Sequence, residues 1–195
     1  MEIRYEIKYS HRRSISLQVP APSGINLDGE PLVLVKAPYG LPKTKILKLI
    51  EEKRPWLTKK INERQAQFEK IAQLGYFSAA ELSDMKKRAR EIIPQRVQHY
   101  ASIGGFKYNK IFIKCQKTLW GSCSAGKNLN FNCLLVLMPL EVLDSVVVHE
   151  LCHLHHMDHS RAFYREVLSL FPGYKKWDKW LKENGGVFLG RIPAR

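Results

Sequence analysis

The chain has 195 residues, of which 45% are hydrophobic and 26% are charged. This composition excludes wholesale disorder, and the length suits one domain or a small domain with an appendage. No stretch approaches the roughly 20 apolar residues that a membrane span needs, and the first residues lack the apolar core of a signal peptide. We therefore expect a cytoplasmic protein with no membrane segment.

The formal net charge of +14, from 32 Lys+Arg against 18 Asp+Glu, predicts a basic surface. Such a surface attracts polyanions over long distances, so an association with nucleic acid is one expectation. No known nucleic-acid-reading motif accompanies the charge, and a solvated basic surface is the alternative. The sequence indicates nothing about the oligomeric state.

The spacing of the four cysteines includes no C-x-x-C pair, so it predicts neither a zinc ribbon nor a disulfide framework. In a reducing compartment each is expected to be a small buried hydrophobe with a free thiol. The four are Cys115, Cys123, Cys133 and Cys152.

The N-terminal region has the signature of strands. Residues 3–9 alternate apolar and charged side chains, residues 15–19 alternate in the same way, and residues 31–38 form an apolar run ended by Pro38. The segment PAPSG, residues 20–24, is typical of a turn. These elements predict a small antiparallel sheet.

Helical periodicity follows the strands. A helix begins at Pro42, a good first helical residue, and is broken or kinked by Pro55, and a second helical segment then continues to Phe68. A third helix begins at Ser78, because Glu81 three residues later completes a capping box.

Strands return in the second half of the chain. Residues 111–115 and 129–138 are predicted strands, joined by the Gly/Ser/Asn-rich connection WGSCSAGKN at 120–128. The longer strand could offer backbone groups to an extended substrate. A helix is expected after Pro139, and it carries most of the histidines.

His149, Glu150 and His153 form an H-E-x-x-H motif on this helix. Residues four apart on a helix differ by about 40° of rotation and about 6 Å of rise, so both imidazoles can share one metal ion. Zn²⁺ suits neutral imidazole, and a water in an open position becomes a nucleophile near neutral pH. Glu150, displaced by about 100°, is placed to act on that water as a general base.

Three further histidines and a glutamate could complete the site. His155 lies about 200° around the helix from the second ligand and points away. His156 returns to the ligand face but lies about 10 Å along the axis, too far for short Zn–N distances. His159 avoids this limit if the chain turns back before Ser160 caps the next helix. We favour His159, with His156 and Glu166 as the alternatives.

The run from Trp120 to Val167 resembles the YgjP-like metallopeptidase family, in which a W-G-S-C turn and an L-x-x-x-P element lead into H-E-L-x-H-x5-H-S-x-x-F. The upstream segments RRSISLQV, KAP and KRPWLTKK are similar to the family's pattern too. One departure is Leu119, where a basic residue is expected. The family is similar to SprT-like proteases, which act on DNA-bound proteins. The resemblance implies Zn²⁺ held by His149, His153 and His159, with Glu150 as the catalytic base.

Elements and resemblance together predict an α+β fold. We expect a zincin-like metallopeptidase domain at residues 76–195, with its HExxH helix against a small antiparallel sheet. Residues 1–75 would form an N-terminal β-rich lobe with linking helices, and the two parts would make one compact unit.

The expected function is that of a zinc-dependent metallopeptidase, which cleaves peptide bonds of a peptide or protein substrate by Glu-assisted attack of a metal-bound water. Two alternatives use the basic surface differently. One is a metal-dependent phosphohydrolase acting on nucleotides, and the other is a nucleic-acid-associated module with a structural metal.

Overall fold

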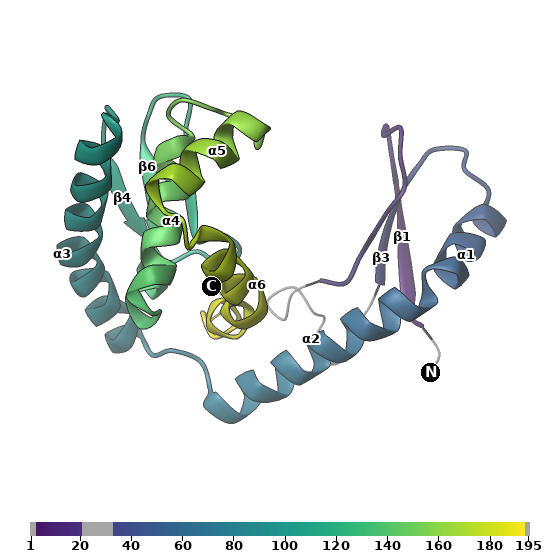
Figure 1. Cartoon of the computed structure of the whole chain (residues 1–195). Helices are drawn as coiled ribbons and strands as arrows, with labels where there is room; N and C mark the ends of the chain where they lie inside the picture. Colours follow the sequence, from purple (N-terminus) through teal and green to yellow (C-terminus); the bar gives the residue numbers. More distant parts are fainter. Residues whose placement is uncertain (1–2, 21–32, 194–195) are drawn as a thin grey trace. The chain divides into compact units, whose positions relative to one another are not determined.

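The computed structural model describes residues 3–20 and 33–193. The chain divides into two compact units, one within Met1–Tyr76 and one at Phe77–Pro193 (Figure 1). The fold is α+β, with six α-helices and two three-stranded sheets among the described residues. The assignment of domains to 1–75 and 76–195 stays a prediction. No helix in the described ranges is long and apolar enough to cross a membrane.

The N-terminal unit contains a mixed sheet. Its strands are β1 (Tyr5–Ser10), β2 (Ser16–Gln18) and β3 (Val33–Pro38), in the order β1-β3-β2. β3 is parallel to β1 and antiparallel to β2. The predicted antiparallel sheet is therefore wrong: β1 and β2 run in opposite directions, and a strand inserted between them must be parallel to one. Of the turn predicted at 20–24, all but Pro20 lies outside the described residues.

Two helices complete this unit. α1 (Lys43–Glu52) begins one residue after Pro42, which was the predicted first residue and is instead the N-cap, and α2 (Arg54–Leu74) carries Pro55 in its first turn. Proline is tolerated there because the N–H it lacks would have no partner inside the helix. The core of the unit consists of Ile3 together with β3 and helix residues that are almost fully buried, namely Val33, Val35, Ala37, Ile46, Ile50, Leu57 and Ile61.

The second unit begins with the long helix α3 (Ala79–Gly104), whose predicted capping box is confirmed. The Ser78 N–H donates to Glu81 Oε2 at 2.7 Å, and the Glu81 N–H donates to Ser78 Oγ at 3.2 Å. A second mixed sheet follows, with β4 (Ile111–Lys114), β5 (Gly121–Cys123) and β6 (Leu129–Asn132) in the order β4-β6-β5. β6 is parallel to β4 and antiparallel to β5, so here too the predicted antiparallel sheet is wrong.

Two predictions in this sheet need correction. The connection predicted at 120–128 contains β5, and the strand predicted at 129–138 ends at Asn132. A 3₁₀-helix, η2 (Cys133–Leu137), follows because the Asn132 side chain accepts the Leu134 N–H at 3.1 Å and turns the chain. The Asn132 amide also donates to the Gln116 and Leu119 carbonyls at 2.7 and 2.8 Å. One buried side chain thus ends β6 and holds the segment that precedes β5.

A disulfide joins Cys115 and Cys133, so the prediction of four free thiols is wrong for these two. The β4–β6 register pairs Lys114 with Asn132, which places the next residues of both strands opposite each other with Cα atoms 5.5 Å apart. That separation suits a disulfide. Cys123 and Cys152 are free, and Cys152 is buried as predicted.

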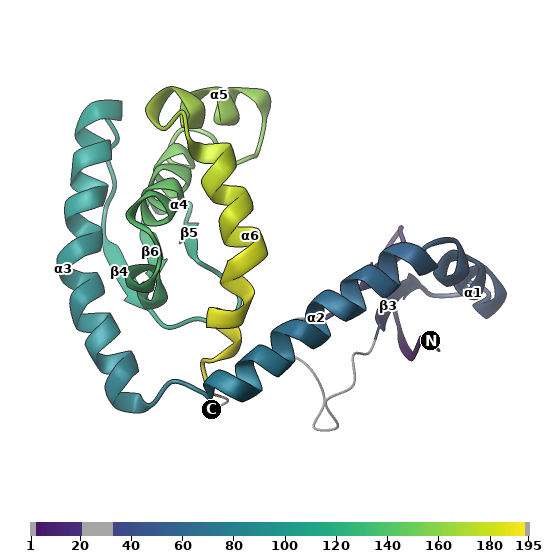
Figure 2. The ribbon, with the colours of Figure 1, turned by 60° about the horizontal axis from the view of Figure 1, so that its bottom comes forward.

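Three helices form the rest of the second unit: α4 (Leu140–Cys152), α5 (Arg161–Leu170) and α6 (Tyr174–Gly190). α4 is almost entirely buried and contacts α3, α5, α6 and β5, and Figure 2 shows it between α3 and α6. On α6, a Cβ at Gly185 would lie 2.8 Å from the Trp120 ring, so this glycine lets the indole pack against the helix.

A salt bridge ties α3 to α4. The Arg96 guanidinium donates to both carboxylate oxygens of Asp144 at 2.7 Å, and the Tyr100 hydroxyl donates to the same group at 3.2 Å. Asp144 is 4% exposed. Arg96→Ala would leave a buried carboxylate without its counter-charge, and we expect the free energy of unfolding to fall by about 3 kcal/mol. Urea unfolding measures this, and an unchanged free energy would contradict it.

Candidate metal centre

The H-E-x-x-H motif lies at the C-terminal end of α4. His149 and Glu150 occupy its last turn, and His153 is the C-cap residue. The N–H groups of His155 and His156 then donate to the Cys152 carbonyl at 3.1 and 3.0 Å, so the chain turns off the helix axis.

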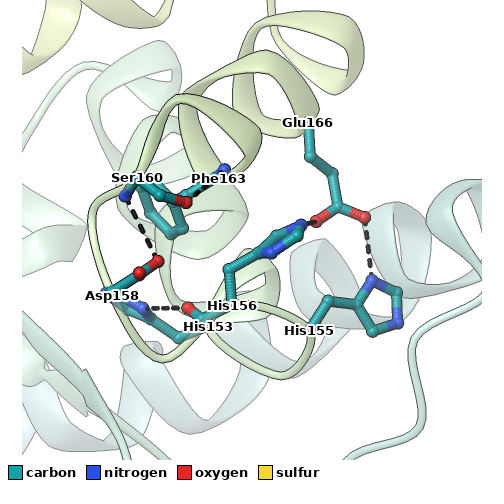
Figure 3. Close-up of polar contacts among 7 residues, drawn as sticks. All are labelled: His153, His155, His156, Asp158, Ser160, Phe163 and Glu166. Atoms are coloured by element: carbon teal, nitrogen blue, oxygen red, sulfur yellow. Dashed lines mark hydrogen bonds and ion pairs between the residues drawn. The ribbon is translucent and has the colours of Figure 1, made fainter.

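The chain re-enters a helix at Ser160, as predicted. Ser160 Oγ accepts the Phe163 N–H at 3.3 Å and caps α5, while Asp158 accepts the Ser160 N–H at 3.2 Å (Figure 3). His159 stands directly before this cap, on the turn between the two helices. Its side chain can therefore approach the end of α4 from outside that helix.

Three imidazoles converge at this point. His149 Nε2 lies 3.2 Å from His153 Nε2 and 3.1 Å from His159 Nε2, and one nitrogen of each ring lies within 4.8 Å of the others. Zn–N bonds of 2.0–2.1 Å in a tetrahedral site give an N···N separation of about 3.3 Å. Among the described residues, no other three His, Cys, Asp or Glu side chains bring their ligand atoms within 4.8 Å of one another in a group that could hold a metal ion. The donor set fits a metal ion.

A hydrogen bond sets the tautomer of the His153 ring. His153 Nδ1 lies 2.9 Å from the His156 carbonyl. A carbonyl only accepts, so Nδ1 carries the proton and Nε2 keeps its lone pair. His149 Nδ1 lies 2.8 Å from the Tyr174 hydroxyl, whose oxygen can likewise accept a hydrogen bond from Nδ1. Each partner leaves Nε2 free for a ligand role, as outer partners of metal-binding histidines do.

Burial keeps His149 neutral. It lowers the pKa of this imidazole to about 4, and the neighbouring His153 and His159 act in the same direction. A neutral ring has the lone pair that a metal ligand requires.

Glu150 is 5% exposed, and its Oε2 is buried with no hydrogen-bond partner. Burial raises the pKa of this carboxyl to about 8. Gly121 of β5 packs directly against it, since a Cβ at that position would lie 2.6 Å from Glu150 Oε1. A buried polar atom without a partner is costly unless something outside the chain satisfies it. Oε2 of Glu150 is therefore available to a water or a substrate.

A cleft of about 360 Å³ opens beside these groups. Its lining includes the side chains of His149, Glu150 and Tyr174, and its walls are mostly apolar. The other lining residues are Thr118, Leu119, Trp120, Gly121, Ser145, Val146, Asp178, Leu181 and Lys182. Leu119, at the predicted departure from the family pattern, thus faces the cleft.

The alternative ligands lie elsewhere. His155 Nδ1 is 2.8 Å from Glu166 Oε1, and His156 Nε2 is 3.4 Å from Glu166 Oε2 (Figure 3). None of these three belongs to the cluster of His149, His153 and His159 that could hold a metal ion. Gly121 is a site residue that the sequence did not single out as such.

The chain was compared with known proteins. The model of the family described as "YgjP-like, metallopeptidase domain" matches residues 78–184. No curated protein matches. The similar solved structures include the metallopeptidase zymogens abylysin of Pyrococcus abyssi and jannalysin of Methanocaldococcus jannaschii. The first is 23% identical, covers 48% of this chain and 96% of its own, and has a TM-score of 0.44. The second is 22% identical, covers 47% and 94%, and has a TM-score of 0.43. Because the family model spans more than half of the sequence, the chain belongs to the YgjP-like family and contains its metallopeptidase domain.

Proposed function

We propose that the protein is a zinc-dependent peptidase of the zincin type, with His149, His153 and His159 as the zinc ligands. The observation that carries this proposal is the convergence of three imidazole Nε2 atoms at a cleft that Glu150 also lines, with Glu150 Oε2 buried and without a hydrogen-bond partner. When bound there, zinc would supply Lewis acidity, which polarises a carbonyl and makes water more acidic. Imidazole nitrogen is a preferred zinc donor, and three protein ligands leave a position open, as catalytic sites require.

Glu150 is the proton carrier in this proposal. Its carboxylate lines the cleft next to His149 and accepts no hydrogen bond at Oε2. It takes a proton from the attacking water and passes it to the amine that leaves. A closed structural metal site has no use for such a group.

The substrate is proposed to be an extended peptide beside β5. β6 is the central strand of its sheet, so it cannot offer an edge, and the edge strand next to α4 is β5. An extended peptide can add to such an edge through main-chain hydrogen bonds. Asp178 and Lys182 on the cleft wall pair with each other at 2.6 Å, so apolar substrate side chains suit the cleft better than charged ones.

Assays on a single preparation of the protein can determine whether it cleaves peptide bonds or phosphate esters. Zinc-loaded protein is assayed against a peptide library and against a panel of nucleotides, with its metal content measured. Peptide turnover that stops on zinc removal and returns on reloading is expected. Nucleotide hydrolysis without peptide cleavage would favour the phosphohydrolase. Salt-sensitive nucleic-acid binding with no hydrolysis would favour the basic binding module. The cytoplasmic location and nucleic-acid association stay predictions.

Gly121→Ala should impair catalysis without removing zinc. The added Cβ would meet Glu150 Oε1 at 2.6 Å and displace the carboxylate. Because a shift of about 1 Å in a catalytic group can cost on the order of 10²-fold, we expect kcat to fall by about that factor. Steady-state kinetics on zinc-loaded protein measure this. Gly173→Ala is the control, since its Cβ would make ordinary contacts at 3.5 Å. Equal kcat values in both variants would contradict the proposed placement of Glu150.

A further inference from the structure

Glu166 of α5 holds both imidazoles of the turn that follows α4. Its Oε1 accepts a hydrogen bond from His155 Nδ1 at 2.8 Å. Its Oε2 is buried and lies 3.4 Å from His156 Nε2, a contact without the alignment of a good hydrogen bond. The His155 ring also packs on the buried Phe106, with ring centroids 4.6 Å apart. Glu166 thus holds the turn through the hydrogen bond from His155 and a longer contact with His156.

The same turn contributes to the metal centre in two ways. The His156 carbonyl accepts the Nδ1 proton of His153 at 2.9 Å, which directs the Nε2 lone pair of that ring toward the other imidazoles. His159 lies three residues further along the same turn, and its Nε2 is 3.1 Å from the Nε2 of His149. In Figure 3 the Glu166 carboxylate extends from α5 toward the rings of His155 and His156.

We propose that Glu166 is a positioning residue for the metal centre. By holding His155 and His156, it sets the conformation of the turn that orients His153 and places His159. It binds no metal itself, and the hydrogen bond from His155 requires no charge on the imidazole. This inference rests on the proposed function, because it assumes that the three histidines hold zinc.

The fold around α5 does not depend on this carboxylate. Phe163 and Val167 of α5 are fully buried in the core, and Ser160 caps the helix. The Glu166 side chain is 23% exposed and borders an open cavity of about 450 Å³. Glu166→Ala should therefore keep the helix packed and release only the turn.

The test measures zinc affinity rather than activity. Wild type, Glu166→Ala and Glu166→Gln are titrated with zinc against a competing chelator. Outer partners of zinc ligands typically change metal affinity by about 10–100-fold, and Glu166 acts through one more residue, so Glu166→Ala should bind zinc about 10-fold more weakly. Glu166→Gln keeps an acceptor oxygen for His155 and should bind zinc close to wild-type affinity. The absorption of bound Co²⁺ should change in the alanine variant alone, because it reports the ligand geometry.

Glu183→Ala is the matched control, because this exposed glutamate on α6 contacts Lys179 at 3.8 Å and takes no part in the turn. Thermal unfolding of the metal-free proteins checks that the variants fold equally well. Wild-type zinc affinity in Glu166→Ala would overturn the inference, and so would equal losses in the alanine and glutamine variants. If wild type itself binds no zinc, the proposed function fails instead.

Discussion

Replacing Glu150 with glutamine is expected to slow peptide hydrolysis severely while leaving zinc bound. Glutamine keeps the size of the side chain in its buried site against Gly121, but it cannot take a proton from water. General acid–base catalysis contributes about 10²–10⁴-fold, so kcat should fall by that factor. The ligand set is unchanged, and zinc content by elemental analysis should remain one ion per chain.

The control for this variant is Glu141→Gln, which alters an exposed glutamate in the first turn of the same helix. It should keep both zinc and activity. Turnover of Glu150→Gln at the rate of this control would show that Glu150 is not the proton carrier. Loss of zinc in Glu150→Gln would instead give the carboxylate a role in holding the metal.

Periodicity located the strands but could not pair them. Alternation in residues 3–9 and 15–19 predicted two of the N-terminal strands, and both lie close to the predicted positions. In each sheet the third strand enters between the first two, which makes the sheet mixed. Alternation identifies a buried face and carries no information about neighbours. The disulfide was missed for the same reason, because Cys115 and Cys133 meet only when β4 pairs with β6.

The histidine cluster could be predicted because its geometry is local. His149 and His153 lie four residues apart and so share one face of a single helix. His159 lies ten residues after His149, in the turn that connects this helix to the next. Tyr174 and Gly121 come from α6 and β5, so only tertiary packing brings them to His149 and Glu150. No spacing in the sequence marks such residues.

His159→Ala is expected to lose zinc, whereas His156→Ala keeps it. Without its third imidazole, the site has two neutral nitrogen donors in place of the usual three or more protein ligands. The affinity should fall by more than the roughly 10–100-fold typical of an outer partner. Chelator competition and elemental analysis of both variants measure this.

The contrast between the two variants depends on main chain and side chain having separate roles at position 156. The His156 carbonyl accepts the proton of His153 and survives replacement by alanine. The imidazole contacts Glu166 at 3.4 Å, and Glu166 retains its shorter hydrogen bond to His155. His156→Ala should therefore weaken zinc binding less than Glu166→Ala does. Loss of zinc in His156→Ala, with retention in His159→Ala, would reassign the third ligand to position 156.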